Sequence, residues 1–109
     1  MPIATRVDRV FDALGDPTRR AVFRRLRKGN RSVREIAEGM NVSRPAVSQH
    51  LKVLKGAGLI AVRIDGARHL YGVDPSAIEV LRNWLDGFWD GTLTAFKAAA
   101  EEEQKKMER

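Results

Sequence analysis

The stretch from residue 32 to residue 59 constrains the fold of this chain most, because it reads as two short helices joined by a tight turn. Ser32 and Glu35 have the spacing of a capping box, in which each side chain accepts from the backbone N–H of the other residue. Ser43 is a second N-cap, and Pro45 falls in the first turn of the next helix, where a missing N–H costs little. This order is the helix-turn-helix pattern.

Each of the two helices is predicted to bury one apolar face. The shorter first helix offers a small apolar set: Ile36, Ala37 and Met40. In the second helix the apolar positions recur at i, i+4 and i+7: Val47, Leu51 and Leu54. Asn41 and Val42 are expected to form the turn, and Gly56 and Gly58 to end the second helix.

The opposite face of the second helix is predicted to contact DNA. It carries short polar groups, an amide and cations, and no Asp or Glu occurs in residues 43–59. An ordinary solvated face, which is the alternative interpretation, usually mixes Glu with Lys. A cationic and amide-bearing face suits a groove with phosphate walls and a floor of donors and acceptors. The predicted DNA-binding residues on this helix are Ser43, Arg44, Pro45, Ala46, Ser48, Gln49, Lys52 and Lys55.

The charge distribution supports a polyanionic partner. Residues 1–73 carry 15 Lys and Arg against 6 Asp and Glu, whereas residues 74–109 carry 5 against 8, which together make the net charge of +6. A basic body followed by an acidic segment favours nucleic-acid binding by the body. A membrane surface would also attract cations, but no predicted helix pairs a basic face with a broad apolar face.

Length and composition set the class of protein. A chain of 109 residues is expected to form one domain, residues 1–109, with a small core. No cysteine is present, which excludes a disulfide framework, a thiolate metal site and a thiol nucleophile. We find no apolar run of membrane-spanning length and no signal peptide, and therefore expect a cytoplasmic protein with no membrane partner.

Two helices are predicted before the helix-turn-helix. Thr5 is a candidate cap for the first, whose inward residues would be Val7, Val10, Phe11 and Leu14. Asp16 and Pro17 begin the second, which is expected to run to Lys28. This second helix is strongly basic, and its cations form either a solvated face or contacts with phosphates beside the groove: Arg19, Arg20, Arg24, Arg25, Arg27 and Lys28.

Residues 60–73 change to a period of two and predict a hairpin. Ile60, Val62 and Ile64 alternate with polar or small residues, as in a half-buried strand. The Asp65 and Gly66 pair is a strong hairpin-turn signal. A hairpin directly after a recognition helix is the wing of a winged helix, so Arg63 and Arg68 are predicted to contact DNA. The alternative is a plain surface hairpin whose arginines serve solubility.

A last long helix, residues 75–100, begins at Asp74 and Pro75 and is predicted to mediate dimerisation. It holds more large apolar side chains than one edge of a small domain can bury, so we expect part of the set to pack against a second copy. The alternative is that all of them join the intramolecular core. The predicted dimer interface, which includes residues of the first helix, is Val7, Phe11, Leu81, Trp84, Leu85, Phe88 and Trp89. Residues after Lys97 are expected to form a solvated helical end that frays.

Several of these segments resemble the ArsR-type winged-helix repressors, which are small dimeric transcription regulators of bacteria and archaea. The resemblance is carried by residues 14–20 (LGDPTRR), by the pattern of residues 43–60, and by the predicted wing 65–71 (DGARHLY), and it covers about residues 6–96. It implies a dimer joined by the first and last helices. It also implies one recognition helix for each half of the operator, with Arg44, Pro45, Ser48 and Gln49 against the major groove.

The chain departs from the metal-sensing members of that family. Those members place Cys pairs on the first helix of the helix-turn-helix, or His, Asp and Glu ligands on the last helix. Here the sequence has no Cys and the last helix has no His, so the metal-sensing role is not carried over. His50 and His69, the two histidines, stand 19 positions apart on different predicted elements, which is not the spacing of a metal site or a catalytic triad.

The sequence therefore predicts a mainly α fold with a small β-hairpin, a winged helix-turn-helix of about five helices and a two-stranded wing, with the helix-turn-helix at residues 32–57. The predicted function is that of a dimeric, sequence-specific repressor that binds double-stranded DNA at an inverted repeat. We expect no enzyme activity, no cofactor and no metal. A small apolar ligand or a protein is a possible effector, received on the aromatic surface around Trp84. The alternative function is a winged-helix module that binds RNA or another protein.

Overall fold

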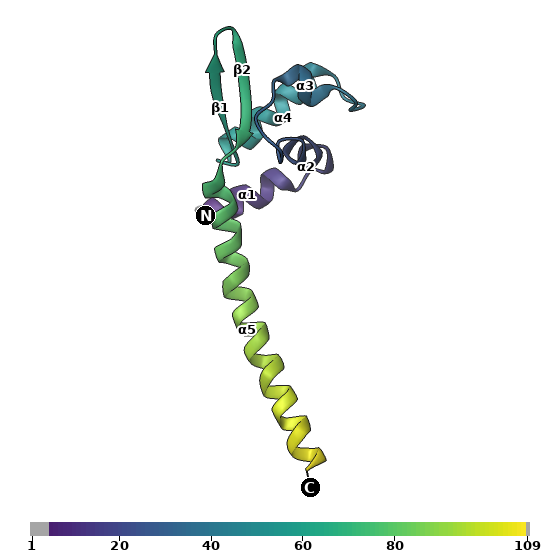
Figure 1. The fold of residues 1–109 in the computed structure, drawn as a ribbon, viewed down its shortest axis with the longest axis vertical. Coiled ribbons are helices and arrows are strands. Elements are labelled where there is room, and N and C mark those ends of the chain that lie inside the picture. Colours follow the sequence, from purple (N-terminus) through teal and green to yellow (C-terminus); the bar gives the residue numbers. More distant parts are fainter. Residues whose placement is uncertain (1–4, 109) are drawn as a thin grey trace, which may run out of the picture.

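The computed structural model describes residues 5–108 and contains five helices and one hairpin (Figure 1). The helices that precede the hairpin are α1 (Arg6–Leu14), α2 (Pro17–Arg24), α3 (Val33–Ala37) and α4 (Arg44–Gly56). Strands β1 (Ile60–Asp65) and β2 (Arg68–Val73) form an antiparallel pair, and α5 (Pro75–Met107) closes the chain. This is the winged helix-turn-helix fold predicted from the sequence.

The helix starts predicted from capping residues are confirmed. Thr5 and Asp8 form a capping box at α1, and Ser32 and Glu35 form one at α3. The side chain of Asp16 accepts from the backbone N–H of Arg19, and that of Ser43 accepts from Ala46. Each cap satisfies N–H groups that have no partner inside the helix.

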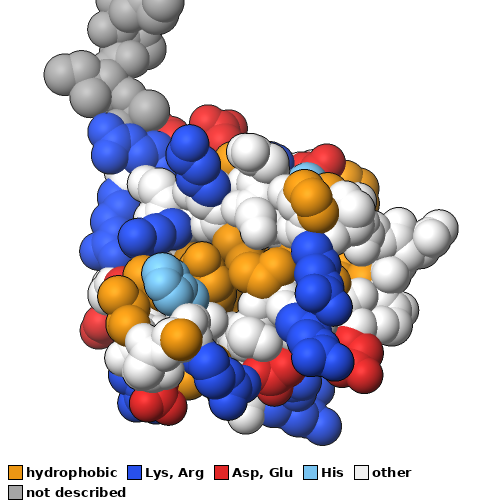
Figure 2. All heavy atoms as spheres, turned by 90° about the horizontal axis from the view of Figure 1, so that it is seen from above, with side chains coloured by type: hydrophobic (Ala, Val, Ile, Leu, Met, Phe, Trp, Pro, Cys, Tyr) orange, Lys and Arg blue, Asp and Glu red, His pale blue; other side chains and the backbone are white. Residues whose placement is uncertain are grey.

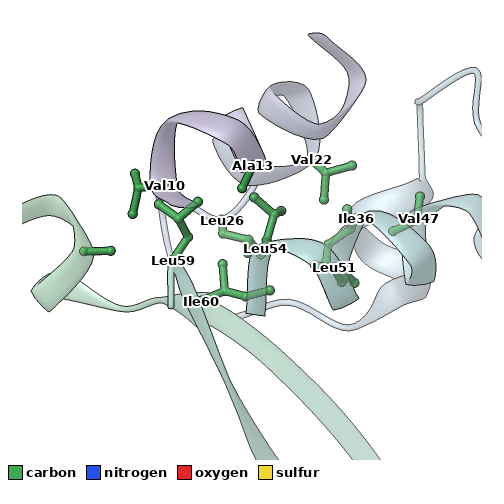
Figure 3. Close-up of a cluster of buried hydrophobic side chains, with 11 residues drawn as sticks. Val10, Ala13, Val22, Leu26, Ile36, Val47, Leu51, Leu54, Leu59 and Ile60 are labelled. Carbon is green, nitrogen blue, oxygen red and sulfur yellow. The ribbon is translucent and has the colours of Figure 1, made fainter. Parts of the chain in front are cut away.

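One apolar core joins all of the helices to the base of the hairpin. Figure 3 shows Leu51 and Leu54 of the predicted α4 stripe among side chains of α1, α2, α3 and β1, with Val47 at the edge of the cluster. The buried set is Val10, Ala13, Val22, Leu26, Ile36, Val47, Leu51, Leu54, Leu59, Ile60 and Ala77. Burial of these side chains holds α3 and α4 in a fixed relation, which is what a helix-turn-helix requires.

Two helices end earlier than the sequence analysis predicted. Helix α2 stops at Arg24 rather than Lys28, because the backbone hydrogen bonds of the next residues change to i, i+3 spacing before Gly29, which has φ +141°. Helix α3 stops at Ala37, and the turn begins before Asn41 because Gly39 adopts φ +78°. Met40 is therefore a turn residue, although it still packs against the core.

The hairpin has a two-residue turn and projects from the body (Figure 1). Its register pairs Ile60 with Val73 at the base and Asp65 with Arg68 at the tip, and Gly66 in the turn has φ +62°. Burial falls along β1, so the expected burial of Ile64 in a half-buried strand is wrong: this residue is 67% exposed. The tip of the hairpin projects beyond the helices (Figure 1), and the last three residues of β1 are all exposed.

A short bridge between Arg31, which lies outside the predicted strands, and Tyr71 of β2 anchors the wing. The backbone N–H of Arg31 donates to the carbonyl of Tyr71 at 2.9 Å, and the N–H of Tyr71 donates to the carbonyl of Arg31 at 2.8 Å. The segment before α3 thus pairs with β2. This pairing fixes the base of the wing relative to the helix-turn-helix.

Helix α5 spans 33 residues, longer than the predicted 75–100, and leaves the body in the direction opposite to the wing (Figure 1). Its start is tied to α1, because the Arg6 guanidinium donates to the Ser76 hydroxyl at 2.6 Å. The molecule measures 73 × 37 × 24 Å as a result. Within residues 5–108, no helix is both long enough and apolar enough to cross a bilayer.

Candidate DNA-binding surface

Helix α4 presents its predicted polar face to solvent. Its three buried residues, Val47, Leu51 and Leu54, are those of the predicted stripe. Of the predicted contact residues, only Ala46 is half-buried, and the exposed ones are Ser43, Arg44, Pro45, Ser48, Gln49, Lys52 and Lys55. The structure therefore brings an amide, two hydroxyls and three cations onto one accessible helix face.

The end of the molecule that carries α4 and the wing is rich in cations. Figure 2 looks onto this end and shows Lys and Arg side chains on both sides of a strip of apolar and uncharged groups. Acidic side chains lie mainly at its periphery. Cations that flank a central reading surface suit a duplex, whose phosphates run along both edges of each groove.

The two wing arginines differ in their surroundings. Arg63 is exposed on β1 opposite Leu70, and no side-chain partner occurs within residues 5–108. Arg68 instead forms an ion pair with Glu35 of α3, with 2.9 Å between Nη2 and Oε1. The Arg68 side chain is still 61% exposed. Its predicted contact with DNA would therefore either replace the ion pair with Glu35 or form in addition to it.

Glu35 joins the helix-turn-helix to the wing through a single oxygen. Its Oε1 accepts from the Ser32 backbone N–H at 3.1 Å, from the Ser32 hydroxyl at 3.0 Å and from Arg68 at 2.9 Å. The two hydrogen bonds from Ser32 hold the pKa of Glu35 below its usual value, and the Arg68 charge adds to this effect. The capping box is predictable from the sequence, but the contact with the wing is not, because Arg68 is 33 positions away.

Substitutions at Glu35 should separate its two roles. Glu35→Gln keeps an acceptor for the capping box but loses the charge paired with Arg68, whereas Glu35→Ala loses both. We expect the urea midpoint at pH 7 to fall from wild type to Gln to Ala. Because the folded-state pKa is lowered, the stabilisation is present above the unfolded pKa of about 4.3 and is lost as the pH falls through the folded value. The difference between wild type and Glu35→Gln should therefore shrink on acidification; a constant difference would contradict the ionic role.

Three of the arginines that follow Pro17 donate hydrogen bonds to backbone carbonyl groups of the same chain. Arg19 donates to the carbonyls of Asp12 and Ala13, and Arg20 donates to that of Leu14. These bonds satisfy the carbonyl groups of Ala13 and Leu14 at the C-terminal end of α1, whereas that of Asp12 also accepts from the Gly15 N–H. Arg25 donates to the carbonyl of Glu38 at 2.7 Å, in the turn after α3. These four hydrogen bonds favour a structural role for Arg19, Arg20 and Arg25 over the predicted phosphate contacts.

A second surface, formed by α1 and α5, is apolar and largely exposed. The rings of Phe11 and Trp84 meet edge to face, with centroids 5.0 Å apart, and Trp84 stacks on Phe88 at 5.8 Å. Trp84 is nevertheless 45% exposed and Phe88 69% exposed. We call the following set the aromatic surface: Phe11, Trp84, Leu85, Phe88, Trp89, Leu93 and Phe96, all exposed. Leu93 and Phe96 extend the predicted interface, whereas Val7 and Leu81 are half-buried.

The two histidines lie on different elements: His50 is half-buried on α4, and His69 is exposed on β2. Across residues 5–108, no three His, Cys, Asp or Glu side chains are grouped so as to hold a metal ion.

Comparison with known proteins places this geometry in a family. Residues 14–63 match the family model of a helix-turn-helix domain. The HTH-type transcriptional regulator Rv2034 of Mycobacterium tuberculosis is 51% identical over 89 residues, which cover 82% of this chain and 83% of that protein. The transcriptional repressor SdpR of Bacillus subtilis is 34% identical over 82 residues, which cover 75% of this chain and 91% of that protein.

A solved structure agrees with these relatives. The homodimeric winged helix-turn-helix DNA-binding domain of Mb0332 from Mycobacterium bovis, a possible ArsR-family transcriptional regulator, superposes with a TM-score of 0.64 at 28% identity. The match covers 81% of this chain and 82% of that domain. Together with the exposed polar face of α4 and the wing beside it, these similarities show that the chain belongs to the ArsR family of winged helix-turn-helix transcriptional regulators.

Proposed function

We propose that this regulator is a homodimeric repressor that binds an inverted-repeat operator and does not sense metals. The observation that carries the proposal is that one chain exposes two distinct surfaces: the polar face of α4 and the aromatic surface of α1 and α5. A surface that exposes seven large apolar side chains on a small domain is typical of an interface with another protein. SdpR, a relative, is a repressor, and the similar Mb0332 domain is homodimeric, which supports the proposal.

Two-fold symmetry determines the form of the DNA site. Two copies joined through α1 and α5 would present two α4 helices related by a two-fold axis, so the operator should be an inverted repeat. The centres of its half-sites should lie about one helical turn, roughly 34 Å, apart. Within each half-site, Ser48 and Gln49 are the proposed base-reading residues, and Arg44, Lys52 and Lys55 the proposed phosphate contacts.

A gel shift tests the function as a whole. The probe is the DNA upstream of the chain's own gene, compared with the same DNA in which one half of the inverted repeat is scrambled. We expect tight binding to the intact repeat and much weaker binding to the scrambled one. Equal binding to both probes, or to an RNA of the same length, would favour the alternative of an RNA- or protein-binding module. That alternative lacks support from α4, whose outer face has no aromatic side chain for stacking on unpaired bases.

Metals should leave operator binding unchanged. Soft metals need thiolate ligands, which this sequence does not have, and a zinc site needs three or four ligands converging at about 2.0–2.3 Å. A site made only of carboxylates on α5 would be weak and unselective. The measurement is operator affinity in EDTA and then in a slight excess of zinc, cadmium, nickel or arsenite. A change of about tenfold with one of them, abolished by His50→Ala or His69→Ala, would refute this part of the proposal.

A further inference from the structure

A groove of about 470 Å³ lies where α1, α2, the base of the wing and the start of α5 meet. This volume falls within the range of about 300–1,000 Å³ that is usual for small-molecule sites. The lining combines four apolar side chains with three arginines, and no carboxylate belongs to it: Leu14, Arg20, Phe23, Arg24, Arg27, Val73 and Ile78. The groove thus has an apolar floor and a cationic rim.

The rim can bind an anion. Arg20, Arg24 and Arg27 follow each other at i, i+4 and i+7, which places them along one side of α2 and the turn after it. Arg20 already donates to the carbonyl of Leu14 at 2.7 Å. Arg24 and Arg27 are exposed, and neither makes a side-chain hydrogen bond or ion pair with another part of residues 5–108. Two guanidinium groups therefore remain free beside the apolar floor.

The apolar floor of the groove argues against a DNA phosphate as its ligand. Leu14, Phe23 and Val73 are half-buried and pack on the core, and Ile78 is 42% exposed. A DNA phosphate could pair with the arginines but would leave this apolar area in water. A molecule with an apolar chain and one anionic end satisfies both parts of the lining.

We propose that the groove binds a free monocarboxylate with an apolar chain. Its carboxylate would pair with the guanidinium groups of Arg24 and Arg27, a geometry that arginine favours because its fork matches two carboxylate oxygens. Its chain would cover Phe23, Val73 and Ile78. The site is separate from the outer face of α4 and from the wing tip.

The position of the groove gives such a ligand a route to regulation, which rests on the proposed dimeric function. The lining comes from α2, which belongs to the body that carries α4, and from Ile78 of α5, the proposed dimerisation helix. A ligand between them would favour one angle of α5 relative to the body. In a dimer this angle sets the spacing of the two α4 helices and hence the fit to the operator.

Calorimetric titration of the full chain with decanoate, kept below its micelle-forming concentration, tests the binding step without DNA. The matched probe is 1-decanol, which has the same chain and no charge. We expect decanoate to bind one site per chain, roughly tenfold more tightly than decanol. Arg24→Gln combined with Arg27→Gln should remove that preference. Arg9→Gln, at an exposed arginine outside the groove, is the control and should leave it unchanged.

Ile78→Asn should weaken decanoate and decanol together, because it changes the floor and leaves the rim intact. The proposal is overturned if the two probes bind equally to the wild type, or if the double arginine variant binds decanoate as the wild type does. Failure of decanoate to show saturable binding to the wild type would also overturn it. Binding seen only after Trp84→Asp and Phe88→Asp would also overturn it, because a second copy would then occupy the groove. Operator binding by the same preparation, measured by gel shift, shows separately whether the proposed function holds.

Discussion

Replacing Trp84 and Phe88 together by Asp is expected to yield a monomer whose affinity for the operator is lower by about 10²- to 10⁴-fold. Both rings lie on the aromatic surface and are in contact with each other, and both are substantially exposed in the single chain. A carboxylate at each position would have to be buried in the proposed interface without a partner, which is strongly unfavourable. Without the dimer, each recognition helix would bind its half-site alone and lose the gain from a second linked contact.

The control for this variant adds the same charge to the other side of the helix. Asn83→Asp and Thr94→Asp introduce two carboxylates at exposed polar positions of α5. These substitutions should leave both the dimer and the operator affinity close to wild type. Sedimentation analysis at micromolar concentration measures the assembly, and a gel shift measures the affinity. A wild-type monomer, or a Trp84 and Phe88 variant that stays dimeric, would contradict the proposed interface.

Gln49→Ala should cost about 1–3 kcal/mol of specific binding while leaving non-specific binding unchanged. Gln49 is exposed on α4, next to Ser48 and within the polar face that the proposed function places in the major groove. A glutamine amide can donate to and accept from the edge of adenine, so its loss removes discrimination between bases. Ser48→Ala should act in the same direction. Competition gel shifts against the operator and against random DNA measure the two affinities.

A phosphate contact should behave differently from Gln49. Lys52→Ala, at an exposed lysine of the same helix, should weaken binding to all sequences and reduce the salt slope by about one. Arg25 is a poorer choice for this comparison, because its guanidinium donates to the Glu38 carbonyl and its removal would disturb the turn after α3. Equal losses on operator and random DNA for Gln49→Ala would refute its base-reading role.

Local signals in the sequence predicted the elements well. The caps at Thr5, Asp16, Ser32 and Ser43 depend on residues three positions apart or fewer, so they can be identified without a structure. The stripe of α4 and the hairpin turn are likewise properties of short segments. The change to i, i+3 hydrogen bonds after Arg24 and the positive φ of Gly39 have no local signal in the sequence, so α2 and α3 end earlier than predicted.

Contacts between distant residues could not be predicted. The arginine-rich segment after Pro17 has the same sequence whether its side chains contact phosphate, water or a carbonyl group. Only the packing of α1, α2 and α3 directs Arg19, Arg20 and Arg25 to free carbonyl groups. The exposure of Ile64 likewise depends on tertiary structure. Apolar residues continue to alternate along β1 beyond the point where the body of the molecule ends, so the local pattern does not show that Ile64 is uncovered.

The sequence by itself determined the order of elements, their caps, the buried stripe of α4 and the polar face opposite that stripe, because these depend on neighbours within one or two turns. Only the tertiary structure decided which apolar side chains remain uncovered on α5, how Glu35 joins α3 to the wing through Arg68, and where a groove opens between α2 and α5. These features depend on the relative placement of segments that are distant in the chain. That placement follows from the burial of one shared core, not from any local pattern.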